Sequence, residues 1–211
     1  MRLFRSLLVA GLGLCLGVPV AAQNIGVLQS AETMNRGTIK LMAAPVMEFG
    51  KNGADDGFGL AARGGYGFTD RFDAEAKLGF FENSTFVGAD GEFWILKSEE
   101  EDSGLDFSLA GGLHWNFAGN DNYDTMGFEV TPLLSGNISS RLELCGALNA
   151  SFESISDAPS GTDDSFTSLH LVPGIEYRLS ERADLVGEVG IGLNDNSSNY
   201  VGIGAAFYLR K

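Results

Sequence analysis

The stretch "TDRFDAEAKLGFF" at residues 69–81 alternates apolar and charged residues with a period of two. Phe72 and Phe80 fall on one side of a strand and Asp73 on the other, because successive side chains of a β-strand point to opposite faces. A soluble barrel or sandwich would place the apolar face in its core. A barrel in a membrane would turn this face to lipid and keep the charges in its lumen.

Ten segments of the chain show this alternation, and almost none has the periodicity of a helix. They lie at 37–49, 57–68, 71–81, 86–97, 104–117, 125–138, 141–153, 166–179, 182–193 and 200–210. The pattern predicts an all-β protein with an antiparallel up-and-down barrel of about ten strands. Eight or twelve strands are the alternatives, because Pro45, Pro132 and Pro173 each remove a ladder hydrogen bond and either mark bulges or split a segment.

Three stretches share one pattern, in which a short turn is followed by an Arg, one apolar residue, an acid and then alternation. They are 69–80, 139–150 and 180–191. The repeating unit is therefore one β-hairpin. Short turns alternate with mostly longer loops along the chain. With an even number of strands, both chain ends lie on the side of the short turns, which is the periplasmic side of an outer-membrane barrel.

The amino-terminal part divides into two predicted pieces. Residues 1–22 combine two arginines, an apolar run and small residues before Gln23, which predicts a secretory signal peptide cleaved near Ala22. Its apolar run is shorter than the roughly 20 residues of a spanning helix. Residues 23–36 form no clear strand and are interpreted as a periplasmic N-terminal segment or a short insert into the barrel base. Residues 37–211 are the predicted barrel.

Composition excludes several classes of function. The formal net charge of −14 disfavours nucleic-acid binding. Cys15 leaves with the signal peptide, so Cys145 has no partner and no disulfide framework is expected. The acidic loops lack the residue spacing of a known calcium loop, and no motif indicates a metal or a cofactor.

The chemistry of the two faces favours the membrane. The polar face carries many glycines, such as Gly59, Gly65 and Gly67, which suit a narrow lumen that also holds long charged side chains. Aromatic residues of the apolar face, such as Phe72 and Phe117, sit toward strand ends, where interfacial girdles lie. Each alternating segment is also long enough to cross the hydrocarbon layer.

Together, the signal peptide, the ten alternating segments, the acidic outer loops and the final strand "YVGIGAAFYLRK" resemble small bacterial outer-membrane β-barrels of the OmpA/OmpX type. The resemblance covers most of the mature chain and rests on pattern, without a diagnostic motif. It implies a monomer in the outer membrane of a Gram-negative bacterium, surrounded by lipid and lipopolysaccharide and inserted by the barrel assembly machinery. The chain departs from the family's terminal aromatic residue, because Tyr208 is followed by Leu209, Arg210 and Lys211.

Charged residues on the polar face predict a lumen ion-pair network, because an unpaired charge away from water costs several kcal/mol. The predicted members are Arg71, Asp73, Glu75, Lys77, Asp106, Arg141, Glu143, Glu176, Arg178, Arg182, Asp184, Glu188 and Arg210. Arg71 is the predicted partner of Asp73. The network either packs a narrow barrel or forms the selectivity constriction of a channel, and packing is favoured at this barrel size.

Three functional hypotheses follow. A structural or surface-interaction role is favoured, and a narrow, porin-like pore for small solutes is the alternative. The third and most distant hypothesis is an outer-membrane lipid-modifying or proteolytic enzyme. Ser168, His170 and Glu176 share a face and resemble the Ser/His/acid set of the lipid-modifying enzymes. Those enzymes work at the lipid-facing surface, whereas this set is predicted to face inward, so no catalytic residue is assigned.

Overall fold

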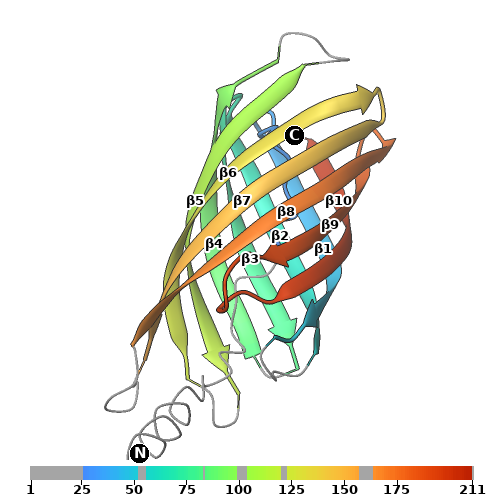
Figure 1. The fold of residues 1–211 in the computed structure, drawn as a ribbon. Helices are drawn as coiled ribbons and strands as arrows, with labels where there is room; N and C mark the ends of the chain where they lie inside the picture. Colours follow the sequence, from blue (N-terminus) through green and yellow to red (C-terminus); the bar gives the residue numbers. More distant parts are fainter. Residues whose placement is uncertain are drawn as a thin grey trace, which may run out of the picture.

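The structure, a computed structural model, describes residues 26–51, 56–82, 84–98, 104–119, 123–156 and 164–210. These residues contain ten antiparallel strands in a closed barrel (Figure 1). The strands are β1 (Thr38–Phe49), β2 (Gly57–Thr69), β3 (Phe72–Phe81), β4 (Ser84–Leu96), β5 (Leu105–Ala118), β6 (Thr125–Ser139), β7 (Leu142–Ile155), β8 (Ser165–Ser180), β9 (Ala183–Gly192) and β10 (Asn199–Arg210). In this part of the chain, no helix is long and apolar enough to cross a membrane.

The first and last strands close the barrel. Pairing of β1 with β10 runs from Thr38 opposite Arg210 to Phe49 opposite Asn199, and every other strand pairs with its neighbours in sequence. No strand of the barrel therefore presents a free edge. The predicted fold class and the count of ten strands are confirmed, and each predicted boundary lies within two residues of the observed one.

The prolines do not mark bulges. Pairing of β1 with β10 skips Pro45 and resumes in the same register, while Pro45 stays paired with Leu60 of β2. Pro132 and Pro173 are likewise paired on one side and skipped in unchanged register on the other. Each proline therefore interrupts one ladder only. The irregular pairings lie instead beside the short turns, as between Gly67 and Thr69.

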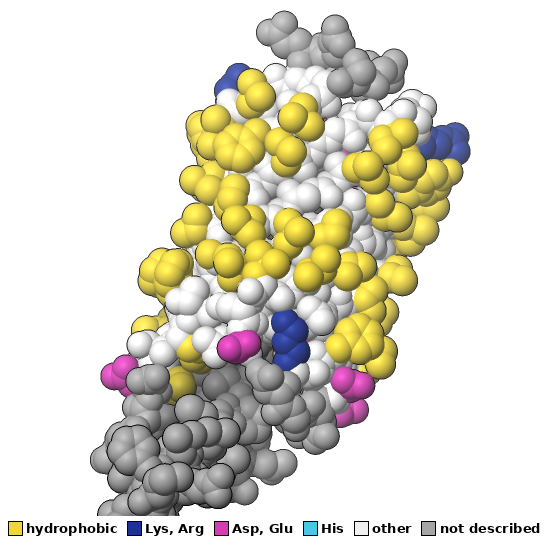
Figure 2. All heavy atoms as spheres, viewed as in Figure 1, with side chains coloured by type: hydrophobic (Ala, Val, Ile, Leu, Met, Phe, Trp, Pro, Cys, Tyr) yellow, Lys and Arg dark blue, Asp and Glu magenta, His cyan; other side chains and the backbone are white. Residues whose placement is uncertain are grey.

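The apolar face of the strands is on the outside. Leu113 in the middle of β5 is 57% exposed, whereas Asp73 of β3 is 2% exposed and points into the lumen. Figure 2 shows hydrophobic side chains over the wall of the barrel, with charged side chains toward its two ends. The prediction that Phe72 and Phe80 face outward is confirmed, because both are exposed.

The outward face predicts a depth-dependent response to charge. Leu113→Lys places an ammonium group at mid-strand and should destabilise the inserted barrel by about 2–4 kcal/mol. Ile138→Lys, beside a short turn, should cost about 1 kcal/mol or less, because its charge reaches the interface. Equilibrium urea titration in phospholipid vesicles measures both. An equal loss of free energy of unfolding at the two positions would argue against a membrane that surrounds the middle of the strands.

Candidate functional site

The lumen contains a segment of the chain itself. Residues 26–36, here called the plug segment, enter the barrel and run along its inside to the inner end, which carries the short turns and both ends of the barrel sequence. Gly37 has a φ of 81° and reverses the chain into β1, with its N–H on the Gly67 carbonyl at 2.8 Å. Residues 26–36 of the predicted N-terminal segment lie inside the barrel, and residues 23–25 lie outside the described residues.

Side chains of the wall bind the backbone of the plug segment. The N–H of Leu28 donates to Glu188 Oε2 at 2.6 Å, and the N–H of Met34 donates to Asp73 Oδ2 at 2.7 Å. A third N–H, of Ala31, donates to a serine hydroxyl of β6 at 3.2 Å. An extended segment without a neighbouring strand must satisfy its buried backbone in this way. The wall therefore holds the plug segment through its backbone.

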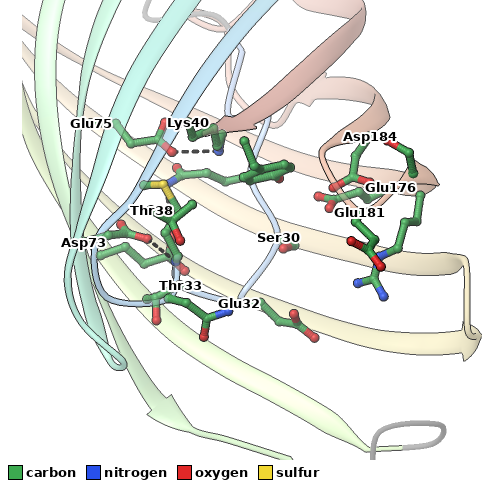
Figure 3. Close-up of a pocket in the computed structure, with 17 residues that line it drawn as sticks. Ser30, Glu32, Thr33, Thr38, Lys40, Asp73, Glu75, Glu176, Glu181 and Asp184 are labelled. Carbon is green, nitrogen blue, oxygen red and sulfur yellow. Dashed lines mark hydrogen bonds and ion pairs between the residues drawn. The ribbon is translucent and has the colours of Figure 1, made fainter. Parts of the chain in front are cut away.

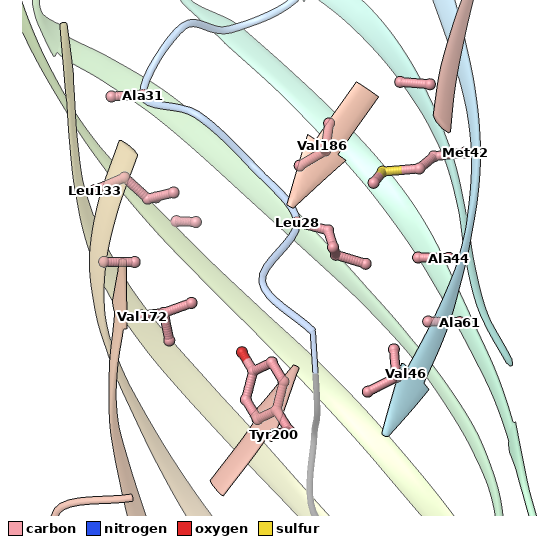
Figure 4. Packing of buried hydrophobic residues seen from close by; sticks show 13 residues of the cluster. Leu28, Ala31, Met42, Ala44, Val46, Ala61, Leu133, Val172, Val186 and Tyr200 are labelled. Carbon is pink, nitrogen blue, oxygen red and sulfur yellow. The ribbon is translucent and has the colours of Figure 1, made fainter. Parts of the chain in front are cut away.

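An apolar patch of the lumen also holds the plug segment. Leu28 is 1% exposed and has a positive φ of 45°, which is uncommon for a residue other than glycine. Figure 4 shows it among apolar side chains of the wall, including Val46, Val186 and Tyr200. Burial of a leucine side chain contributes roughly 1.5–3 kcal/mol. Leu28 thus anchors the plug segment inside the barrel.

A layer of ion pairs crosses the lumen beside the plug segment. Lys40 Nζ lies 2.7 Å from Glu75, Arg63 Nη2 lies 2.8 Å from Asp90, and Lys77 Nζ lies 2.9 Å from Asp90. Arg63 also contacts Glu75, and Lys77 contacts Glu129. This ion-pair belt comprises Lys40, Arg63, Glu75, Lys77, Asp90 and Glu129, all buried.

Arg63 joins the belt to the plug segment. Its guanidinium donates to the carbonyl oxygens of Gly26 and Val27 and, at 2.8 Å, to the side-chain oxygen of Gln29. Gln29 in turn donates to Glu92 at 2.9 Å. Plug segment and belt therefore form one hydrogen-bonded unit.

Glycines on β2 make room for this unit. A Cβ at Gly67 would lie 2.3 Å from the carbonyl oxygen of Asn35, and a Cβ at Gly65 would lie 2.5 Å from the Met34 side chain. A Cβ does not approach backbone as closely as it would at Gly67, whereas the Met34 methyl beside Gly65 would have to shift. The small residues of the polar face therefore admit the plug segment as well as the long charged side chains.

At the outer end, the connection between β9 and β10 folds inward onto β8. Ser197 is fully buried, and its hydroxyl accepts the N–H of Leu169 at 2.7 Å. His170 Nε2 lies 3.0 Å from the carbonyl oxygen of Ser198, and Ser168 donates to that of Asn196 at 3.2 Å. Ser168 and His170 thus contact this connection, whereas Glu176 lies near the inner end, so the three are not brought together.

The inner end of the lumen holds a cavity of about 410 Å³ (Figure 3). It is lined by Gln29, Ser30, Glu32, Thr33, Met34, Asn35, Thr38, Lys40, Asp73, Glu75, Glu92, Glu176, Arg178, Ser180, Glu181, Asp184 and Tyr208. Asp73, Lys40 and Glu75 lie on one side in the close-up, and Glu176, Glu181 and Asp184 on the other. This inner cavity is rich in carboxyl groups.

The predicted network residues divide into several groups. Glu75 and Lys77 belong to the belt, Asp73 and Glu188 bind the plug segment, and Asp106 accepts the indole N–H of Trp94 at 3.1 Å. Glu176, Arg178 and Asp184 line the inner cavity, as do Asp73 and Glu75. Glu143 is buried on the lumen face.

The three arginines at the short turns behave differently from their acids. Arg71, Arg141 and Arg182 are exposed and form no ion pair with another described residue. Asp73 binds the plug segment in place of its predicted partner Arg71. The side chain of Arg210 lies outside the described residues.

Sequence reasoning missed the belt members Lys40, Arg63, Asp90 and Glu129, and it missed Glu92. One signal was available for Arg63, which is the only long side chain on the polar face of a strand otherwise made of glycine and alanine there. A lone cation with small neighbours indicates that something else fills the space beside it.

Comparison with solved structures finds similar barrels. An outer membrane channel of Pseudomonas putida F1 is 10% identical, with a TM-score of 0.58, and the match covers 85% of this chain and 98% of that chain. The N-terminal β-barrel domain of Pseudomonas aeruginosa OprF is 14% identical, with a TM-score of 0.36, over 83% of this chain and 100% of that chain. Ail, the attachment invasion locus protein of Yersinia pestis, is 14% identical, with a TM-score of 0.37, over 83% of this chain and 100% of that chain. At these identities the likeness concerns the fold alone.

The sequence itself decides the family. No curated protein matches it. Residues 8–208, nearly the whole chain, match the family described as outer membrane protein beta-barrel domain. The outer-membrane location and the resemblance to small bacterial outer-membrane barrels are therefore confirmed. The chain belongs to the outer membrane protein β-barrel family.

Proposed function

We propose that this protein is a non-conducting outer-membrane barrel with a structural and surface-interaction role. One observation carries the proposal: the lumen is crossed by the plug segment and the ion-pair belt, which Arg63 joins into one unit. A solute would have to displace both. Separating a buried ion pair leaves uncompensated charges at a cost of about 3–5 kcal/mol.

The remaining parts of the proposal concern the surroundings of the barrel. We propose a monomer in outer-membrane lipid and lipopolysaccharide, inserted by the barrel assembly machinery after cleavage near Ala22. The loops of the outer end present the protein to the cell exterior. A catalytic role is not part of the proposal, since Ser168 and His170 bind the connection between β9 and β10 instead of each other.

A narrow pore is the second candidate, and the inner cavity favours it. The cavity is an opening of the lumen toward the periplasm, and it ends at the plug segment. The plug segment is joined to the barrel wall by hydrogen bonds and packing, and it continues into β1 through Gly37. A pore would therefore require withdrawal of the plug segment from the lumen.

Planar bilayer recording separates the two candidates. The purified mature protein should give no single-channel steps, because plug segment and belt block the lumen. A control variant lacks residues 26–34 and has four belt residues replaced at unchanged net charge, and it should conduct. Its substitutions are Arg63→Ser, Glu75→Ser, Lys77→Ser and Asp90→Ser. Reproducible steps from the intact protein would overturn the non-conducting role and support the pore.

The belt should also dominate the stability of the lumen. Glu75→Gln removes the carboxylate that pairs with both Lys40 and Arg63, and it should lower the free energy of unfolding by about 3–5 kcal/mol. Glu181→Gln, the same change at an exposed turn position, should alter it by about 0.5 kcal/mol or less. Urea titration in vesicles compares the two variants. A similar small effect of both would show that the belt contributes little.

A further inference from the structure

The inner cavity lies at the inner end of the lumen, beside the plug segment and the ion-pair belt. Its lining comes from the plug segment, from the inner ends of the strands and from the turn between β8 and β9. The belt residues Lys40 and Glu75 form part of this lining, and beyond them Arg63 holds the plug segment at Gly26 and Val27. A molecule in this cavity therefore enters from the periplasm and goes no further. The cavity has the geometry of a binding site more than that of a channel mouth.

Charge in the inner cavity is not balanced by the residues that line it. The lining contains seven carboxyl groups and two basic side chains. One of the two, Lys40, is already paired with Glu75 at 2.7 Å, which leaves Arg178 for the other acids. Burial, and to a lesser extent the nearby Asp106 carboxylate, raise the pKa of Glu32. The cavity therefore attracts cations.

Two buried carboxylates of the lining have an oxygen without a partner. Asp73 is 2% exposed and accepts the N–H of Met34 with Oδ2, while its Oδ1 has no hydrogen bond. Asp184 is 6% exposed and forms hydrogen bonds with Glu176 and Tyr208, while its Oδ1 has no hydrogen bond. A buried polar atom left unsatisfied costs about 1–3 kcal/mol, and more for a charged group. A donor from outside the chain would relieve this cost at both carboxylates.

The positions of the two carboxylates indicate the shape of that donor. Asp73 lies on β3 and Asp184 on β9, and the strands β10, β1 and β2 separate them around the barrel. Figure 3 shows Asp73 on one side of the cavity and Asp184, with Glu176, on the other. Within the described residues, no three acidic, histidine or cysteine side chains converge as metal ligands. Two separated anionic groups match a ligand with two separated cationic groups.

The volume of the cavity and the apolar part of its lining also favour a ligand with two separated cationic groups. A volume of about 410 Å³ falls in the range of small-molecule sites, roughly 300–1,000 Å³, and far exceeds a bare ion. Met34 and Tyr208 add apolar surface to the lining, which can contact a methylene chain. Both features suit ammonium groups joined by short hydrocarbon spacers.

We propose that the inner cavity binds a small organic oligoamine from the periplasm, with one ammonium group at Asp73 and another at Asp184 and Glu176. The bound amine donates hydrogen bonds to the two carboxylate oxygens that the fold leaves unsatisfied. Its charge offsets the excess of acids in the lining. Binding requires neither conductance nor withdrawal of the plug segment, so it stands independently of the proposed non-conducting role.

Calorimetric titration with spermidine tests the proposal. The mature protein in detergent micelles, at low salt and neutral pH, should bind one spermidine per chain. The double variant Glu176→Gln with Asp184→Asn should bind about 100-fold more weakly, at about tenfold, or 1.4 kcal/mol, for each carboxylate removed. Butylamine, with a single ammonium group, should bind at least about tenfold more weakly than spermidine for the same reason.

A matched control removes two lumen carboxylates from the opposite end. The double variant Glu48→Gln with Glu153→Gln makes the same change of charge on the lumen side at the outer end, where neither residue lines the inner cavity. It should keep its spermidine affinity within about twofold, since it leaves the amine's contacts intact. The heat-dependent gel shift of folded barrels confirms that each variant is inserted and folded.

Three results would overturn the proposal. The first is a folded protein that shows no saturable spermidine binding. The second is an equal loss of affinity in the inner and outer double variants, which would mean diffuse attraction by the net charge. The third is saturable binding of Mg²⁺ alone at one ion per chain, lost in the inner variant and as tight as that of spermidine, which would assign the cavity to a metal ion.

Discussion

The pairing of β1 with β10 is the constraint on which the rest of the structure depends. In hydrocarbon, each unpaired backbone N–H or C=O costs several kcal/mol, so a sheet must close on itself to remain in the membrane. Closure with ten strands sets a narrow lumen, and alternation sends every second side chain into it. The same requirement that turns Leu113 and Phe80 to lipid therefore gathers the buried charges of the protein in one confined space.

The buried charges in a narrow lumen need partners inside the lumen itself. The ion-pair belt neutralises its own members. The plug segment supplies N–H groups to Glu188 and Asp73, which form no ion pair with another described residue. These carboxylates in turn satisfy a backbone that has no neighbouring strand. Wall and plug segment therefore stabilise each other. The barrel wall alone explains neither the lumen carboxylates Glu188 and Asp73 nor the glycines of β2.

Much of the fold could be predicted from the sequence, because a period of two over ten segments leaves few alternatives. The direction of the faces could also be predicted, since glycine on the polar side has little use on a soluble surface. The pairing of charged side chains inside the lumen could not be predicted from the sequence. It depends on the register between strands far apart in sequence, as for Lys77 and Glu129. Arg71 illustrates the error: spacing along one strand suggested that it pairs with Asp73, but an arginine beside a turn extends into solvent.

The plug segment left one trace in the sequence that alternation alone does not explain. On the lumen face of β1, Met42, Ala44 and Val46 are apolar, although the opposite face of the same strand is also apolar. A water-filled lumen would gain nothing from these side chains, and they are buried against Leu28 instead. At the inner end, Asp73 uses one oxygen for Met34 and leaves the other toward the cavity. A cation bound there would keep the Met34 hydrogen bond intact and hold Asp73 in its charged form, which accepts that bond best. Occupation of the inner cavity would thus strengthen the seating of the plug segment, and by linkage a seated plug segment would favour the cation.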